Sequence, residues 1–211
     1  MIYAIGNSHA HFFTNSHPAE HKGTNPDQHF TSYSLGPTIA YNYYEHHLPK
    51  LKQLISQINI QPKDHILLVI GEVDCRWHLP KQAATQNRPI NDIIKECVQR
   101  YTRVYTHLKQ HNYNLISWGG HPSTTTDHND DPQSPVYGDC KTRNQITLEW
   151  DHQLSQQAQK LNIPHISINQ HLIDQNGLTK MEYYIDYCHL NSEKLLPHVK
   201  QLFEQTGLIK I

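Results

Sequence analysis

Ser8 follows a short apolar run at the start of the chain, directly after Gly6 and Asn7. A serine at a strand end, where a glycine turn leads into a helix, exposes its hydroxyl and turns its own N–H outward. This placement suits a nucleophile, because the same backbone can stabilise the oxyanion that the attack creates. Serine is also a common helix N-cap. Ser8 alone therefore leaves both roles open.

Asp186 and His189 lie three residues apart, just before the last apolar-periodic segment. At this separation in a turn, the carboxylate can accept a hydrogen bond from Nδ1 of the histidine and leave Nε2 to deprotonate a hydroxyl. The alternative is a local Asp–His hydrogen bond at a helix start, with Asn191 or Ser192 as the cap. Together with an early strand-end serine, the pair favours a Ser–His–Asp hydrolase.

Polar residues also follow the other predicted strands. Residues 71–78 read Gly-Glu-Val-Asp-Cys-Arg-Trp-His, and residues 119–121 read Gly-Gly-His. Ligands of an open parallel sheet bind at the carboxyl ends of its strands, so these side chains are expected at one rim. For Glu72, Asp74 and Arg76, an ion-pair network that anchors the loop is an equal alternative to a role in the site.

The elements that position these residues are predicted from hydrophobic periodicity. Short apolar runs bounded by turn residues predict strands at Ile2–Ile5, His65–Ile70, Asn114–Trp118, His165–Ile168 and, more weakly, His29–Ser34. Helical spacing of apolar residues predicts helices over 48–58, 90–108, 146–161 and 195–203. Alternating strands and helices predict one α/β domain over 1–211 with a parallel sheet covered on both faces. The polar segments 14–28 and 121–139 are predicted loops.

These residues resemble, in order and spacing, the sequence blocks of the SGNH (GDSL-like) hydrolases. Residues 6–9 resemble the first block, usually Gly-Asp-Ser; Gly36 resembles the second; residues 71–74 fall where Gly-x-Asn-Asp is usual; and residues 186–191 resemble the Asp-x-x-His block. The resemblance spans residues 2 to about 205. It implies a flavodoxin-like three-layer α/β/α sandwich with a sheet of roughly five parallel strands. It also implies hydrolysis of an ester, often an acetyl or acyl group on a sugar or lipid.

By this resemblance Ser8 is the nucleophile, His189 the general base and Asp186 the residue that orients it. Val73 departs from the family, because it stands where an asparagine normally gives the third oxyanion donor. Loss of one such donor typically lowers kcat by about 10²–10³-fold. Residues 71–78 resemble a poorly characterised subgroup with a Gly-Glu-Ile-Asp-like third block. The residues expected to hold the substrate or its oxyanion are Gly36, Asp74, Arg76, His78 and His121.

Three alternatives use the same residues differently. The triad residues could transfer the acyl group to another hydroxyl instead of water. The fold could serve as a non-catalytic binding protein, which the valine at position 73 would favour. A metal site is a further alternative, built from His9, His11, Asp74 and His78, although no assembled ligand spacing is visible. Cys188 stands beside His189 and could act as a cysteine nucleophile. We favour the simpler interpretation that it is one of the two unspecified residues of the Asp-x-x-His block.

Composition narrows the class of protein. The chain has 211 residues, a net charge of -1 and 18 histidines, so no electrostatic attraction to nucleic acid or anionic membrane is expected. Its four cysteines form no Cys-x-x-Cys pair. The N-terminus does not read as a signal peptide, and no run approaches a membrane span. We therefore expect a cytoplasmic enzyme that acts on a small acyl ester without a cofactor or metal.

Overall fold

A sheet of five parallel strands forms the centre of the computed structural model, which describes residues 1–23, 28–130 and 135–210. The strand order is β2-β1-β3-β4-β5, the order of flavodoxin-like folds. The strands are β1 (Ile2–Gly6), β2 (Phe30–Ser34), β3 (His65–Val69), β4 (Asn114–Trp118) and β5 (His165–Ile166). All five predicted strands are confirmed, but β5 is shorter than expected. The chain leaves the sheet at Ser167, and the hydroxyl of this residue donates a hydrogen bond to the carboxylate of Asp151.

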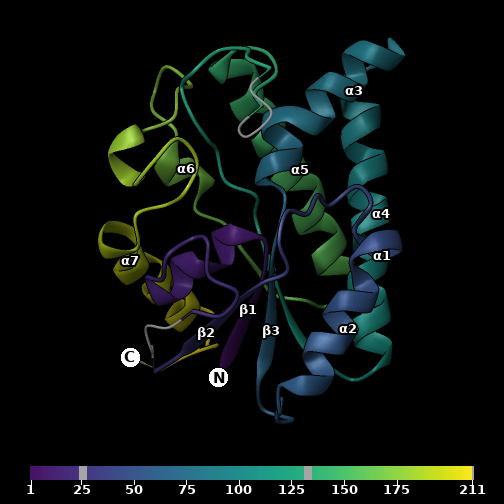
Figure 1. Cartoon of the computed structure of the whole chain (residues 1–211), viewed down its shortest axis with the longest axis vertical. Helices are drawn as coiled ribbons and strands as arrows, with labels where there is room; N and C mark the ends of the chain where they lie inside the picture. Colours follow the sequence, from purple (N-terminus) through teal and green to yellow (C-terminus); the bar gives the residue numbers. More distant parts are fainter. Residues whose placement is uncertain (24–27, 131–134, 211) are drawn as a thin grey trace.

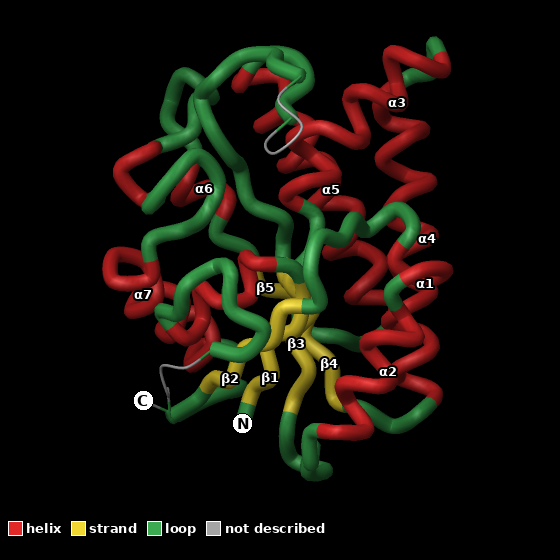
Figure 2. The backbone as a smooth tube through the Cα atoms, in the orientation of Figure 1, coloured by secondary structure: helices red, strands yellow, loops and turns green. Residues whose placement is uncertain are grey.

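Helices cover both faces of the sheet, which gives the predicted three layers (Figure 1). Helices α1, α2, α4 and α5 lie on one face, and η1, α6 and α7 lie on the other (Figures 1 and 2). In chain order the helical segments are η1 (Ser8–Thr14), α1 (Tyr43–His46), α2 (Leu48–Gln57), η2 (Asp74–His78), α3 (Leu79–Gln86), α4 (Ile90–Gln110), α5 (Cys140–Lys160), α6 (Asn169–Leu172), η3 (Met181–Tyr183) and α7 (Ser192–Gln205).

Strand β3 shows how one sequence serves both layers. Ile66 and Leu68 point into the core beneath α4 and α5, and Leu67 and Val69 into the core beneath η1 and α7, as the two-residue period of a strand requires. The four predicted helices are confirmed, and α7 continues through Pro197. Helix α3 was not predicted, because its polar sequence carries too few apolar residues to show a period.

The carboxyl ends of β1 and β3 form the switch point of the sheet, because the chain leaves β1 toward one layer and β3 toward the other. The backbones approach closely here. A Cβ on Gly6 would lie 2.0 Å from the carbonyl oxygen of Val69, and Gly71 has φ +122 with the Trp150 ring where a Cβ would be. Only glycine fits at these two positions.

The first of the two polar segments predicted as loops runs beside β2, where Lys22 forms an antiparallel bridge with Tyr33, and the second follows β4. Residues 24–27 of the first and 131–134 of the second are outside the described residues, and the rest contain no strand or regular helix beyond η1. Among the helices described, none combines the length and apolar character that crossing a bilayer requires.

Candidate active site

Ser8 is the first residue of η1, at the carboxyl end of β1. The preceding residue, Asn7, caps this helix: its side-chain oxygen accepts a hydrogen bond from the N–H of His9 at 3.1 Å. The cap that was an alternative role for Ser8 is thus filled by its neighbour. The hydroxyl of Ser8 is left for another partner.

That partner is His189, in the loop before α7. Oγ of Ser8 lies 2.8 Å from Nε2 of His189, and Nδ1 of His189 lies 2.7 Å from Oδ2 of Asp186. The other oxygen of Asp186 accepts the backbone N–H groups of Cys188 and His189 at 2.9 and 2.7 Å. Asn191 caps α7. Both oxygens of the carboxylate are therefore fixed, which holds the imidazole in one orientation.

The electrostatics of this trio favour a neutral histidine beside a charged aspartate. Burial lowers the pKa of His189, as does the neighbouring His9, and Asp186 opposes these effects only in part. Burial alone would raise the pKa of Asp186, but the hydrogen bonds from His189 and Cys188 lower it below its usual value. A neutral imidazole can accept the proton of a hydroxyl, as a general base must.

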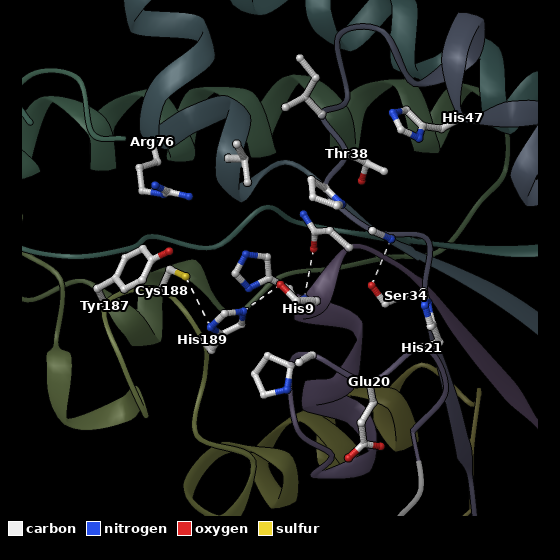
Figure 3. A pocket seen from close by; sticks show the side chains of 18 of the residues that line it. His9, Glu20, His21, Ser34, Thr38, His47, Arg76, Tyr187, Cys188 and His189 are labelled. Carbon is white, nitrogen blue, oxygen red and sulfur yellow. Dashed lines mark hydrogen bonds between the residues drawn. The ribbon is translucent and has the colours of Figure 1, made fainter. Parts of the chain in front are cut away.

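Ser8 and His189 open into a cavity of about 530 Å³. Figure 3 shows Cys188, Tyr187 and Arg76 on the same side of the cavity as His189, and Thr38 and His47 at the opposite end. The remaining wall comes from Asn7, His9, residues 18–21, Ser34, Gly36, Pro37, Ile39, Asn42 and Val73. The volume suits a small organic substrate.

Gly36 lies in this wall, as expected, with φ +84. Its N–H donates to Oγ of Ser34 at 3.2 Å. Val73 also lines the cavity and offers no donor where the SGNH pattern has an asparagine. The asparagine donor of the SGNH pattern is therefore absent from this position.

Arg76 lines the same cavity and is tied down by two hydrogen bonds. Its Nε donates to Glu72 at 2.7 Å and its Nη1 donates to the carbonyl of Pro135 at 2.6 Å. The guanidinium lies over the ring of Tyr187, 5.4 Å from its centroid. A guanidinium has five N–H donors, so these bonds leave capacity for a substrate.

Glu72 links Arg76 to His9. Its second carboxylate oxygen lies 3.0 Å from Nε2 of His9, and both side chains are almost fully buried. Burial alone would raise the pKa of Glu72, but Arg76 and then His9 outweigh it and hold that pKa well below its usual range. The expected ion pair between Glu72 and Arg76 is present, and it reaches the active-site histidines through His9.

Asp74 and His78 do not line the cavity, contrary to expectation. Segment η2 is a π-helical turn, and it directs the side chains of Asp74 and His78 toward the loop after β2. Asp74 accepts the N–H groups of Ala40 and Tyr41 at 2.7 and 3.2 Å, and the ring of His78 packs against that of Tyr41. Asp74 is fully buried, and burial raises its pKa to about 7. These two residues belong to the scaffold of the site.

His121 lies beneath the site. Its Nε2 lies 3.2 Å from the carbonyl oxygen of Cys188, its ring contacts that of His9, and burial lowers its pKa to about 3. It borders only a small cavity of about 40 Å³ next to Ser8. Of Arg76, His78 and His121, the three expected side chains that can donate a hydrogen bond to an oxyanion, Arg76 is the one in the main cavity.

The metal site considered from sequence is not assembled. Both ring nitrogens of His11 are engaged, by Oγ of Ser32 at 2.8 Å and by the carbonyl of Glu20 at 2.6 Å. Asp74 and His78 point elsewhere, so His9 is the only one of the four that lines the main cavity.

Among the cavity residues that sequence reasoning missed are Thr38, Asn42 and His47. Each carries a buried polar atom without a hydrogen-bond partner, namely Oγ1, Oδ1 and Nδ1. These residues could have been found from their position in the sequence, because they follow β2 and the carboxyl end of β2 lies at the same edge of the sheet as Ser8.

Comparison with known proteins locates the fold. No protein-family model and no curated protein sequence matches the chain. Solved structures do match. A Bacteroides fragilis protein assigned as an acylhydrolase has a TM-score of 0.63 at 13% identity, over 99% of this chain and 88% of its own. A GDSL-like lipase from Bacteroides thetaiotaomicron has a TM-score of 0.61 at 13% identity, over 97% and 88%. The acetyl xylan esterase AlAXEase has a TM-score of 0.55 at 13% identity, over 97% and 99%. The fold of this chain is that of the SGNH (GDSL-like) hydrolases.

Proposed function

We propose that this protein is a serine-dependent hydrolase of ester bonds. The observation that carries the proposal is the continuous hydrogen-bonded chain from Ser8 through His189 to Asp186, with distances of 2.8 and 2.7 Å, at the wall of a cavity. The named activities of structures with this fold, an acylhydrolase, a lipase and an acetyl xylan esterase, support it.

The reaction follows from the roles these positions allow. Oγ of Ser8 attacks the acyl carbonyl while Nε2 of His189 takes its proton, and Asp186 stabilises the imidazolium. The tetrahedral intermediate collapses and expels the alcohol, which receives the proton from His189. Water then attacks the acyl-Ser8 ester, His189 again takes and returns a proton, and the free acid leaves.

The oxyanion of the intermediate needs donors. We assign the N–H groups of Ser8 and Gly36 to it, and Arg76 as the third donor in place of the missing asparagine. The N–H of Gly36 is bonded to Ser34 at 3.2 Å, so this long bond must yield when the oxyanion forms. Because charge develops only in the transition state, such donors act chiefly on kcat.

The cavity also points to the class of alcohol in the substrate. The side chains of Thr38, Asn42 and His47 line the cavity and hold polar atoms without partners. Thr38 and His47 lie at the end of the cavity away from His189 (Figure 3). Buried polar atoms are nearly always paired, and sugar hydroxyls supply both donors and acceptors. We propose an O-acylated carbohydrate, and the acetyl xylan esterase among the similar structures agrees with this choice.

The test compares the proposed triad with a matched set of residues elsewhere in the chain. Ser117, His165 and Asp151 are also linked by hydrogen bonds, at 3.0 and 2.8 Å, but Ser117 is completely buried in β4. We expect Ser8→Ala and His189→Ala to abolish p-nitrophenyl acetate turnover, whereas Ser117→Ala and His165→Ala retain it.

A fluorophosphonate should label Ser8, identified by peptide mass spectrometry, and should not label Ser117. Equal turnover in the wild type and in Ser8→Ala, or absence of labelling at Ser8, would remove the proposal and favour a binding protein on the same fold. Free acid as the only acyl product with a sugar acceptor present would separate hydrolysis from acyl transfer.

A further inference from the structure

Three side chains with metal-binding atoms meet in the wall of the main cavity: His9, Cys188 and His189. Each offers one ligand atom, and the three atoms lie within 4.8 Å of one another. The sulfur of Cys188 is 3.6 Å from Nδ1 of His189. Figure 3 shows the Cys188 and His189 side chains directed toward each other. Within the described parts of the chain, no other group of three such residues has this spacing.

His9 is already oriented as metal-binding histidines usually are. Its Nε2 is held by the carboxylate of Glu72 at 3.0 Å. A metal-binding histidine almost always gives its other ring nitrogen to a carboxylate or carbonyl, which fixes the tautomer and raises its basicity.

Nδ1 of His9 supplies a second, independent observation. This nitrogen is buried and has no hydrogen-bond partner, and the side chain is only 5% exposed. Leaving a buried polar atom unpaired is unfavourable. Because Glu72 fixes the other ring nitrogen, Nδ1 is the atom of His9 that remains for a ligand.

We propose that His9, Cys188 and His189 bind one divalent transition-metal ion of the Zn²⁺ type, and that the bound ion switches off the triad. Two imidazoles and a thiolate with one open position form a donor set that zinc accepts. Bond lengths of about 2.0–2.1 Å to nitrogen and about 2.3 Å to sulfur require the three side chains to move together by roughly 1 Å. On binding, the thiol of Cys188 releases its proton to solvent.

Inhibition follows from the use of both nitrogens of His189 by the triad. Nε2 holds Ser8 and Nδ1 holds Asp186. An ion that takes either nitrogen breaks one of these two hydrogen bonds. Metal binding and hydrolysis therefore exclude each other. The inhibitory half of this inference rests on the proposed function, whereas the binding half does not.

Cobalt spectroscopy tests the binding half without any measurement of activity. Zn²⁺ has a filled d shell, so Co²⁺ is titrated in its place into the full chain, reduced and stripped of metal. We expect one equivalent to produce a near-ultraviolet thiolate-to-cobalt band. Surface histidines such as the contacting His107 and His111 cannot produce this band, because they supply no thiolate.

The variants that decide are Cys188→Ser and His9→Gln. The first should eliminate the band, and the second should weaken Co²⁺ binding by at least about tenfold, the loss that even an outer partner of a ligand causes. The matched control is Cys140→Ser, which removes a buried thiol outside the cavity and should keep the band. Absence of the band in the wild type, or its persistence in Cys188→Ser, would overturn the proposal.

Inhibition is measured with Zn²⁺ alone on p-nitrophenyl acetate turnover, each variant relative to its own rate in chelator. We expect wild-type turnover to fall with Zn²⁺ and to return with a chelator, and Cys188→Ser to need at least about tenfold more Zn²⁺. If the cobalt band appears but the protein has no esterase activity in chelator, the proposed function is wrong and the metal site is supported. If the activity depends on Ser8 and His189, is unchanged by Zn²⁺, and no cobalt band appears, the metal site is wrong and the proposed function is supported.

Discussion

The ring of His9 lies against the ring of His189, with centroids 4.8 Å apart and planes inclined by 37°. His9 is bonded in turn to Glu72, and Glu72 forms a buried ion pair with Arg76. The proposed general base, His189, therefore has a second, carboxylate-bound histidine as its neighbour. Any positive charge on His9 disfavours the protonated form of His189.

The acid limb of the pH–rate profile should report this contact. His189 acts as a base only when neutral, and burial followed by repulsion from His9 lowers its pKa from the ordinary value of 6.5. Activity should therefore fall only as the pH drops through a midpoint below 6.5. In His9→Gln the repulsion is gone, so the midpoint of kcat/KM should move to higher pH. The profiles are recorded in chelator, and a wild-type midpoint above 6.5 or a downward shift in the variant would contradict this account.

Asp186→Asn tests the orientation of His189. The amide can still occupy the site, but it removes the charge that stabilises the imidazolium and favours the wrong tautomer, so kcat should fall by about 10³–10⁴-fold. The matched control is Asp151→Asn. The carboxylate of Asp151 lies 2.8 Å from Nε2 of His165, and neither residue lines the cavity. Its kcat should stay within about twofold of the wild type. Equal losses in the two variants would point to a general effect on folding.

Thr38→Val tests the proposed polar end of the cavity. The hydroxyl of Thr38 is buried without a partner, and the residue is 4% exposed. If this hydroxyl binds a sugar hydroxyl, the variant should lose about 1 kcal/mol of binding and raise KM roughly fivefold for an acetylated sugar. The values for p-nitrophenyl acetate should not change, and Thr38→Ser should behave as the wild type. A parallel change for both substrates would argue against a sugar subsite.

The residues that could be predicted from sequence are those placed by the chain's own local pattern. Ser8 follows a strand and a glycine turn, and the three-residue spacing of Asp186 and His189 closes their hydrogen bond within one turn. The carboxyl ends of parallel strands meet at one edge, so the order of the elements was enough to bring these segments together. The five strands were predicted from short apolar runs bounded by turn residues, which are also a local pattern.

Residues whose direction depends on distant contacts could not be predicted. Asp74 was expected in the site, but the turn of η2 directs it to the N–H groups of Ala40 and Tyr41, 34 and 33 residues away in sequence. His9 was paired with His11 by sequence spacing, whereas its partner is Glu72, 63 residues away. No periodicity marks such pairs, because they are made by packing of the layers.

Asp74 itself gives a stability prediction. Asp74→Ala would leave the buried N–H of Ala40 and the partly buried N–H of Tyr41 without an acceptor, and an unsatisfied buried group costs about 1–3 kcal/mol. We expect the free energy of unfolding in urea to fall by about 2–4 kcal/mol. Asp74→Asn keeps one acceptor oxygen of similar shape and should lose about half as much. A loss below about 0.5 kcal/mol in Asp74→Ala would show that water replaces the carboxylate.

The pH dependence of stability isolates the charge on Asp74. Burial raises its pKa to about 7 in the folded chain from an ordinary 3.8, so between these values the folded state binds more protons than the unfolded state. The contribution of Asp74 to stability therefore falls as pH rises from about 4 to about 7 and is constant above that range. Asp74→Asn does not titrate. The difference in unfolding free energy between wild type and Asp74→Asn should thus shrink from pH 5 to pH 8, by roughly 1–3 kcal/mol. A difference that stays constant from pH 5 to pH 8 would mean that the hydrogen bonds from Ala40 and Tyr41 outweigh burial and keep Asp74 charged.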